Sequence, residues 1–283
     1  MPHRADDAPG FKAIRFNADW ITRPLFGIAL AAAVVAAVFG GGPFIAALGA
    51  LAGVAAAREW HRMVGERVFG PAFYMSAITV VLALAGQAIV PHGVVGWTIL
   101  LCGAGIVGAY ALTSHMHAFW HGLGPIYIAT APLMLVMLRG VPHGAWIIIG
   151  LFLAIWSTDT AALIVGNLVG GPRLWPSLSP NKTWSGTLGA VVVAAVVEAI
   201  FIKILGGNAI EAGLYGAAVA ILSHAGDLFE SWIKRVFHLK DSGGMIPGHG
   251  GVLDRVDSTL VAAPVIASLV LFAGLNPMFG AHP

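Results

Sequence analysis

One stretch of the chain, residues 144–167, reads GAWIIIGLFLAIWSTDTAALIVGN, and Asp159 is its only charged residue. A helix needs about 20 mostly apolar residues to cross the hydrocarbon core of a bilayer, so this stretch predicts a membrane-spanning helix. The rest of the chain has the same character. Of its 283 residues, 58% are hydrophobic and 10% are charged, whereas a typical soluble domain has about 25% charged residues. This composition excludes a water-soluble globular enzyme.

Apolar runs bounded by glycine, proline or charged residues recur on both sides of this stretch. The predicted spans are 24–39, 43–57, 72–90, 94–112, 124–138, 144–167, 187–205, 211–230 and 258–274. The first two are short and close together, so they form either a tight helical hairpin or one re-entrant unit. We therefore expect an all-α polytopic integral membrane protein, with about nine transmembrane helices in one bundle. No internal repeat or linker divides the sequence, so residues 1–23 are expected to form a tail and residues 24–283 a single transmembrane domain.

The positions of the basic residues predict the orientation in the membrane. All 15 Lys and Arg residues except Arg139 and Lys203 fall on the side of the spans that carries the N-terminus. Basic residues accumulate in cytoplasmic segments, so the N-terminal tail and the loop 231–257 are predicted to be cytoplasmic and the C-terminus to lie outside.

Charged residues inside spans are costly and need a partner, a cavity or a place at the interface. In the eighth span, Ser223, Asp227, Glu230 or Ser231, and Lys234 recur at spacings of three and four, which aligns them on one helix face. Two interpretations remain open: a salt-bridged face that holds helices together, or a face turned toward a functional cleft.

The polar loop that follows favours the second interpretation. Residues 231–257 read SWIKRVFHLKDSGGMIPGHGGVLDRVD, which combines glycines with basic and acidic side chains. Glycines allow a close backbone approach to a ligand, Lys and Arg neutralise phosphate, and converging carboxylates hold Mg²⁺. Asp254 and Asp257 share a helix face at the start of the last span, either as site residues or as simple capping acids. The pattern indicates phosphoryl or nucleotidyl transfer.

The same loop resembles the signature of the phosphatidate cytidylyltransferases, also called CDP-diacylglycerol synthases. The matching residues are Ser231, Ile233-Lys234-Arg235, Lys240-Asp241, Gly243, Ile246-Pro247, His249-Gly250-Gly251, Asp254-Arg255 and Asp257. The resemblance implies transfer of a cytidylyl group from CTP to phosphatidic acid, giving CDP-diacylglycerol and pyrophosphate in phospholipid biosynthesis. It also implies a polytopic helical fold in a bacterial inner membrane, dimers in many members, and Mg²⁺ with a second cation near the cytoplasmic face.

The metal ligands that carry over from the family are Asp227 and Asp254, and Asp159 and Asp257 are candidates for completing or orienting the site. The expected phosphate partners and catalytic cations are Lys182, Lys234, Arg235, Lys240 and Arg255, together with Ser179 and the turn at Gly250 and Gly251. His249 is expected either to donate to a phosphate oxygen or to brace the glycine turn.

Two further family segments match less well. Ala161 stands where the family usually has glycine, and Leu163 stands where it has an aromatic residue. Ser185 replaces the glutamate of a Ser-Pro-x-Lys-Thr-x-Glu-Gly motif at residues 179–186. These departures leave open a divergent paralogue that acts on another lipid phosphate.

Other classes remain as alternatives. A cation transporter would use the intramembrane acids Asp159, Asp227 and Glu198, but it does not account for the glycine-rich cationic loop. Another lipid-linked enzyme, such as a polyprenol kinase, is a third alternative. The net charge of +2 without a basic stripe argues against a nucleic-acid partner.

Two groups of polar residues receive simpler interpretations. Residues 58–62, Arg-Glu-Trp-His-Arg, are interpreted as a cytoplasmic anchor. His115, His117 and His121 have the spacing of metal ligands, but Trp120 among them favours an interfacial loop.

Overall fold

The computed structural model describes residues 19–67, 69–243, 245 and 250–275, and this part of the chain contains nine α-helices and one β-hairpin. The helices are α1 (Asp19–Gly40), α2 (Gly42–Met63), α3 (Pro71–Ile89), α4 (Val95–Thr113), α5 (Ala118–Arg139), α6 (Gly144–Val169), α7 (Trp184–Ile204), α8 (Ala209–Val236) and α9 (Leu253–Phe272). Each predicted span corresponds to one helix in the same order. Helices α3 to α9 are long and apolar enough to cross a membrane, which confirms the all-α polytopic class.

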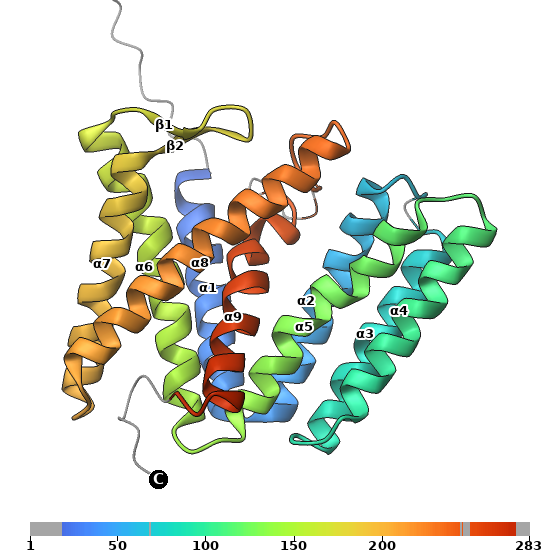
Figure 1. Ribbon diagram of the computed structural model, residues 1–283, viewed down its shortest axis with the longest axis horizontal. Coiled ribbons are helices and arrows are strands. Elements are labelled where there is room, and N and C mark those ends of the chain that lie inside the picture. The colour runs from blue at the N-terminus through green and yellow to red at the C-terminus, as the bar shows by residue number, and fades with distance from the viewer. Residues whose placement is uncertain (1–18, 68, 244, 246–249, 276–283) are drawn as a thin grey trace, which may run out of the picture.

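The first two spans are expected to form either a helical hairpin or one re-entrant unit, and α1 and α2 decide between the two. Gly41 separates α1 from α2 and has a φ of 103°, a conformation that glycine adopts without strain. Helix α1 descends from the upper end of the molecule and α2 returns to it (Figure 1). The two therefore form a helical hairpin, and its apolar arm in α1 covers Gly27–Gly40.

Local sequence signals start several helices. The side chain of Asn208 accepts hydrogen bonds from the backbone N–H groups of Ile210 and Glu211 at the start of α8. The hydroxyl of Thr183 accepts one from Gly186 at the start of α7. Pro71 occupies the first turn of α3, where its missing N–H has no helical partner to lose. These caps satisfy N–H groups that a helix cannot pair within itself.

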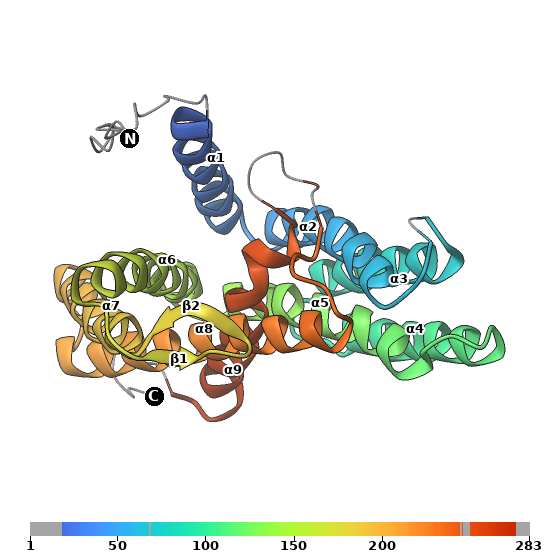
Figure 2. The ribbon, with the colours of Figure 1, turned by 90° about the horizontal axis from the view of Figure 1, so that it is seen from above.

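The helices form two groups, which α8 and α9 join where they cross. Helices α2 to α5 pack together, and α6 to α8 pack together. Helix α9 packs against both α5 and α8, and α8 runs diagonally across the molecule between the groups (Figure 1). Seen from above, α1 projects from the side of the bundle and the β-hairpin lies over the group of α6 to α8 (Figure 2).

The β-hairpin is an element that the sequence did not predict. Strand β1 (Arg173–Trp175) pairs antiparallel with β2 (Ser179–Thr183), and the Arg173 guanidinium donates to the Asn181 carbonyl at 2.9 Å. The short strands close the connection between α6 and α7. They place Lys182 over the bundle.

The expected boundaries also shift. Helix α8 continues to Val236 and α9 begins at Leu253, so both ends of the predicted loop 231–257 are helical. The aligned polar residues from Ser223 to Lys234 favour a longer α8, because Glu230 and Lys234 form an ion pair one turn apart. At the N-terminus, α1 begins at Asp19, inside the predicted tail 1–23, and residues 1–18 of that tail lie outside the described residues.

The two exceptional basic residues lie at the end opposite the loop between α8 and α9. Arg139 ends α5, and its Nε donates to the carbonyl of Val38 near the end of α1 at 2.7 Å. Lys203 lies in the last turn of α7. The side of the bundle to which they belong is the one where α1, α5 and α7 end (Figure 1).

Candidate active site

The site is built where α8 and α9 cross. Gly226 makes the close approach possible, because a Cβ on it would lie 2.6 Å from the backbone oxygen of Asp257 and 3.0 Å from the Cα of Ser258. Any larger residue would push the two helices apart. The next residue, Asp227, is therefore held directly against the first turns of α9.

Asp227 has a partner on each carboxylate oxygen. Its Oδ2 accepts a short hydrogen bond and ion pair from Nζ of Lys182, which β2 supplies. Its Oδ1 accepts from the hydroxyl of Ser258 at 2.6 Å. The structure thus brings together a carboxylate and a lysine that are 45 residues apart in the sequence.

Asp254 is held just as firmly in the first turn of α9. Its Oδ1 accepts from Nζ of Lys234 at 2.6 Å. Its Oδ2 accepts from the Ser242 hydroxyl at 2.9 Å and from the Gly251 N–H at 3.0 Å. Gly250 has a φ of 84°, which folds the turn back over Asp254. In the structure, the N–H of Gly251 is therefore engaged by a carboxylate of its own turn.

Glu59 on α2 is a component that the sequence interpretation missed. Its side chain is 3% exposed, so it does not behave as a surface anchor. Its Oε2 accepts from the backbone N–H of Leu253 at 2.9 Å and lies 3.4 Å from the Ser242 hydroxyl. A Cβ on Gly251 would lie 2.6 Å from the same oxygen. Glu59 thus caps α9 from another helix, and nothing in residues 58–62 signals a contact with a segment 194 residues away.

Two more carboxylates, those of Glu230 and Asp257, belong to the same two helices as Asp227 and Asp254. Glu230 is 1% exposed, and its two oxygens have no hydrogen-bond donor within the described part of the chain, although Nζ of Lys234 lies 3.4 Å from Oε1. Asp257 accepts from the N–H of Ser258 at 2.8 Å through one oxygen. Hard divalent cations prefer carboxylate oxygens, so buried Glu230 oxygens without donors beside Asp227, Asp254 and Asp257 are a donor set that fits Mg²⁺.

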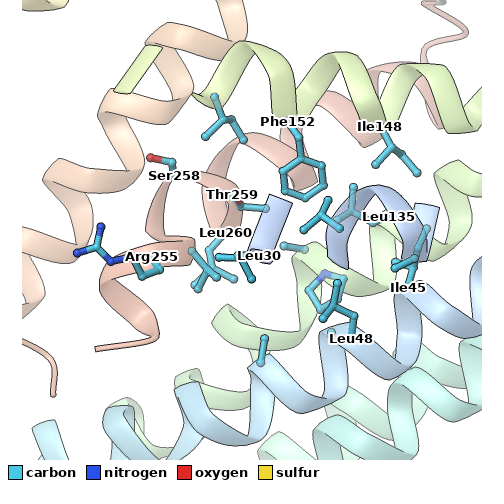
Figure 3. A pocket seen from close by; sticks show the side chains of 18 of the residues that line it. Leu30, Ile45, Leu48, Leu135, Ile148, Phe152, Arg255, Ser258, Thr259 and Leu260 are labelled. Carbon is cyan, nitrogen blue, oxygen red and sulfur yellow. The ribbon is translucent and has the colours of Figure 1, made fainter. Parts of the chain in front are cut away.

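An apolar cavity of about 180 Å³ opens beside the site. Side chains of α1, α2, α5, α6 and α9 line it, and its polar residues include Asp159, Arg255 and Ser258. Figure 3 shows Arg255 and Ser258 at one side of the cavity and Leu48, Leu135 and Ile148 farther along it. The cavity therefore joins a charged end to an apolar interior.

The structure does not bring every predicted residue to this cluster. Arg235 is exposed and donates to the carbonyl of Leu239 at 2.9 Å. Lys240 is exposed and makes no hydrogen bond or ion pair with the residues that the structure describes. Ser179 is half-buried in β2. His249 lies outside the described residues.

The positions that depart from the family pattern have identifiable surroundings. Leu163 is 66% exposed on the outside of α6, whereas Ala161 is buried. The Ser185 hydroxyl donates a short hydrogen bond to the carbonyl of Gly170 and lies 3.1 Å from the Thr183 hydroxyl. Ser185 thus closes the connection that carries Lys182.

Comparison with known proteins places this chain in a family. The model of the cytidylyltransferase family matches residues 21–273. The chain belongs to the cytidylyltransferase family. A protein of Brucella suis biovar 1 (strain 1330) named phosphatidate cytidylyltransferase is 44% identical over 160 residues, which are 55% of this chain and 57% of that protein.

Two other family members with the same name align over more of their length. The Rickettsia bellii (strain RML369-C) protein is 34% identical over 200 residues, covering 65% of this chain and 87% of its own. The Pseudomonas aeruginosa (strain PAO1) protein is 33% identical over 230 residues, covering 76% and 83%. The chain matches a little over half of the Brucella protein and more than four fifths of the other two.

Within this cytidylyltransferase-family fold, Glu198 stands apart from the site. It is 0% exposed on α7, and neither of its oxygens has a hydrogen-bond partner among the described residues. It packs against Gly216, where a Cβ would lie 2.7 Å from its Cγ. Gly216 and Asp227 are separated by about 16 Å along α8. Glu198 is therefore outside the carboxylate cluster at the crossing of α8 and α9.

Proposed function

We propose that this protein transfers a cytidylyl group from CTP to phosphatidic acid, releasing pyrophosphate and forming CDP-diacylglycerol, with Mg²⁺ as the cofactor. One observation carries the proposal: in a chain of the cytidylyltransferase family, Asp227 and Asp254 are each paired with a lysine, and Ser258, which donates to Asp227, lines an apolar cavity together with Arg255. A lipid phosphate needs such an environment, because its head is anionic and its tails are apolar.

The cavity supports a lipid acceptor. A diacyl anchor is too costly to extract from the bilayer at every turnover, so the acyl chains must stay in an apolar environment while the phosphate reacts. The lining from Leu48 to Ile148 supplies that environment, and Arg255 lies where the phosphate head would enter. Arginine is suited to bind a phosphate through two parallel hydrogen bonds.

The carboxylates would hold the cofactor. Asp227 and Asp254 are the proposed ligands. Glu230 shares Lys234 with Asp254, and Asp257 adjoins Ser258, which donates to Asp227, so both are candidates to complete or orient the set. Asp159, which lines the cavity, is a further candidate. When bound, the cation would neutralise phosphate charge and orient the α-phosphate for displacement.

The protein's own residues would do the remaining work by positioning charge. A phosphate oxygen of phosphatidic acid attacks the α-phosphorus of CTP, the new P–O bond forms, and the bond to the bridging oxygen of pyrophosphate breaks. The lipid supplies the nucleophile, so no covalent enzyme intermediate is required. Lys182 and Lys234 can turn from their carboxylates toward phosphate oxygens, and Arg255 can hold the lipid head.

We also propose that the end of the bundle bearing the β-hairpin and the glycine turn is cytoplasmic, at a bacterial inner membrane. The bias of basic residues toward that end supports this, with Arg139 and Lys203 as the exceptions. In a Cys102→Ala background, we expect cysteine at Asp241 to react with a membrane-impermeant reagent only in inverted vesicles. Cysteine at Glu211 should react only in right-side-out vesicles. The opposite pattern, or labelling of both from one side, would contradict this orientation.

The activity itself is tested with the purified full-length protein in phospholipid nanodiscs. We expect radiolabelled CTP and dioleoyl phosphatidic acid to give a CDP-lipid and pyrophosphate in equal amounts, in a reaction that a chelator stops and Mg²⁺ restores. Diacylglycerol, which lacks the nucleophilic phosphate, is the matched control substrate and should give no product. Failure to form a CDP-lipid from phosphatidic acid in a folded preparation would overturn the proposal. Preference for a different lipid phosphate would favour the paralogue interpretation.

A further inference from the structure

A second cluster of ligating side chains lies apart from the carboxylates, where α2, α3 and α5 meet. His61 is in the last turn of α2, Glu66 is in the connection to α3, and His121 is in the first turn of α5. Both histidines are 0% exposed, and the Glu66 side chain is 4% exposed. The prediction that His121 belongs to an interfacial loop is therefore wrong, because the start of α5 is covered, whereas His115 and His117 are exposed.

The three side chains converge on one point. Nδ1 of His61 lies 2.7 Å from Nδ1 of His121 and 4.0 Å from Oε2 of Glu66. One ligand atom from each residue lies within 4.8 Å of the other two. Ligand atoms in a tetrahedral zinc site with Zn–N bonds of about 2.0–2.1 Å are about 3.3 Å apart. The observed spacings of 2.7 and 4.0 Å lie on either side of that value, and the two rings are nearly parallel, at 10° to each other, so metal binding requires the imidazoles to separate and turn toward a common point.

Hydrogen bonds pair every ring nitrogen of this cluster except one. Nε2 of His61 lies 2.6 Å from the Ser76 hydroxyl, and the two Nδ1 atoms can share only one proton between them. Nε2 of His121 is buried without a hydrogen-bond partner among the described residues. Nε2 and Nδ1 of one imidazole point in different directions, so this unpaired atom is not a proposed ligand, and the convergence of the three side chains is what indicates a metal site.

Glu66 adds a negative charge at the same place. Its two oxygens accept the backbone N–H groups of Ala72 and Phe73 at 2.8 and 3.0 Å, which caps α3. Each oxygen keeps a second lone pair. A buried carboxylate beside two neutral imidazoles is short of positive charge, and a divalent cation would supply it.

We propose that His61, Glu66 and His121 bind one transition-metal ion of the zinc class, with His61 Nδ1, His121 Nδ1 and Glu66 Oε2 as ligands. Two imidazoles and one carboxylate suit Zn²⁺ better than Mg²⁺, which prefers an all-oxygen set. Ser76 holds the His61 ring through its other nitrogen, as partners of metal-ligating histidines commonly do.

The metal would act as a clamp for the neighbouring site. It would join the end of α2, the connection to α3 and the start of α5, where the Trp60 indole N–H already donates to the Trp120 carbonyl at 2.8 Å. Glu59, which caps α9 and contacts the Ser242 hydroxyl, lies two residues before His61 on α2. The clamp would therefore fix the helix end from which Glu59 reaches the glycine turn. This proposal does not depend on the reaction that the site catalyses.

The test uses the full-length protein in detergent, freed of metal with a chelator and then titrated with Zn²⁺ and with Co²⁺ as a spectroscopic probe. We expect about one tightly bound Zn²⁺ per chain and the visible absorption of Co²⁺ in a tetrahedral N/O site. His121→Ala and Glu66→Gln should each weaken Zn²⁺ binding by at least about tenfold. Zinc should also raise the melting temperature of the wild type but not that of either variant.

Two control variants show whether Zn²⁺ binds at this cluster and nowhere else. His115→Asn changes an exposed histidine of the same turn region, at a φ of 56° that asparagine tolerates, and should leave Zn²⁺ binding unchanged. Asp227→Asn should also leave it unchanged, because Asp227 belongs to the carboxylate cluster. If His121→Ala does not fold, Glu66→Gln decides, because glutamine keeps an oxygen acceptor for α3. Absence of Zn²⁺ from the wild type, or binding unchanged in Glu66→Gln, would show a hydrogen-bonded histidine pair only and would overturn the proposal.

Discussion

Carboxylates lie inside the bundle both where α8 and α9 cross and in the middle of α7, but their hydrogen-bond partners differ. Asp227 and Asp254 each receive a lysine and a serine hydroxyl, whereas Glu198 receives no hydrogen bond within the described part of the chain. The cost of a buried charge flags both places in the sequence. Partners on two helices and a hairpin distinguish a functional cluster from an isolated acid.

This contrast shows that the convergence of side chains from several segments indicates a functional site better than the burial of one acid does. The paired acids are contributed by segments on either side of the glycine turn; Lys182 and Ser258 contact Asp227, and Lys234 contacts Asp254. Glu198 faces Gly216 alone, well away from that network. Substitutions at the two places should therefore differ strongly in their effect on activity.

The largest effect is expected from Asp227→Asn and Asp254→Asn. In the proposed assignment both residues bind one cation, so each change should lower CDP-lipid formation by more than about 100-fold, and the double variant should cost little more, as for residues that act as a unit. The measurement is turnover as a function of Mg²⁺ concentration, with size-exclusion chromatography to confirm folding. Substantial activity in either folded single variant at ordinary Mg²⁺ would show that the ligands are assigned wrongly.

A somewhat smaller effect is expected from Lys182→Ala. The lysine pairs with Asp227 from β2 and is available to a phosphate oxygen, so its loss should lower turnover or raise the CTP requirement by about 10- to 100-fold. Lys203→Ala, at the opposite end of the bundle, is the matched control and should retain wild-type kinetics. Wild-type kinetics in Lys182→Ala would give the hairpin a purely structural role.

Glu59→Ala should have an intermediate effect through positioning. It leaves the N–H of Leu253 unpaired and loosens the turn over Asp254, at a cost of about 1–3 kcal/mol in stability. Glu59→Gln keeps an oxygen acceptor and should recover most of the stability and much of the turnover. Thermal unfolding and kcat are measured together for both variants, with the exposed Glu211→Ala as control. Equal loss in both Glu59 variants would mean that the charge, rather than the cap, matters.

The smallest effect on activity is expected at Glu198. Glutamine there replaces a buried carboxyl group that lies outside the site, so turnover should stay within about twofold of the wild type while the melting temperature rises or stays the same. The same assay and thermal unfolding check both expectations. A large loss of turnover in Glu198→Gln would mean that Glu198 is coupled to the site after all.

Much of the architecture could be predicted because the bilayer imposes it locally. Apolar runs long enough to cross a membrane must be helical, so the seven segments from α3 to α9 follow from composition and length. The helical stripe from Ser223 to Lys234 and the first turn at Asp254 could also be placed by spacing alone. The hairpin could not be predicted, because β1 and β2 have only three and five residues and their pairing depends on the ends of α6 and α7.

The amino-acid sequence is enough to establish the fold class and to locate the loop that carries the site, because hydropathy and short motifs act within a few neighbouring residues. The meeting of distant groups follows only from the folded structure: Lys182 with Asp227, Glu59 with the start of α9, and His61 with His121. The physical reason is that these contacts depend on how helices cross. The close approach at Gly226 and the packing of α2 on α5 leave no periodic trace in the chain that a linear pattern can show.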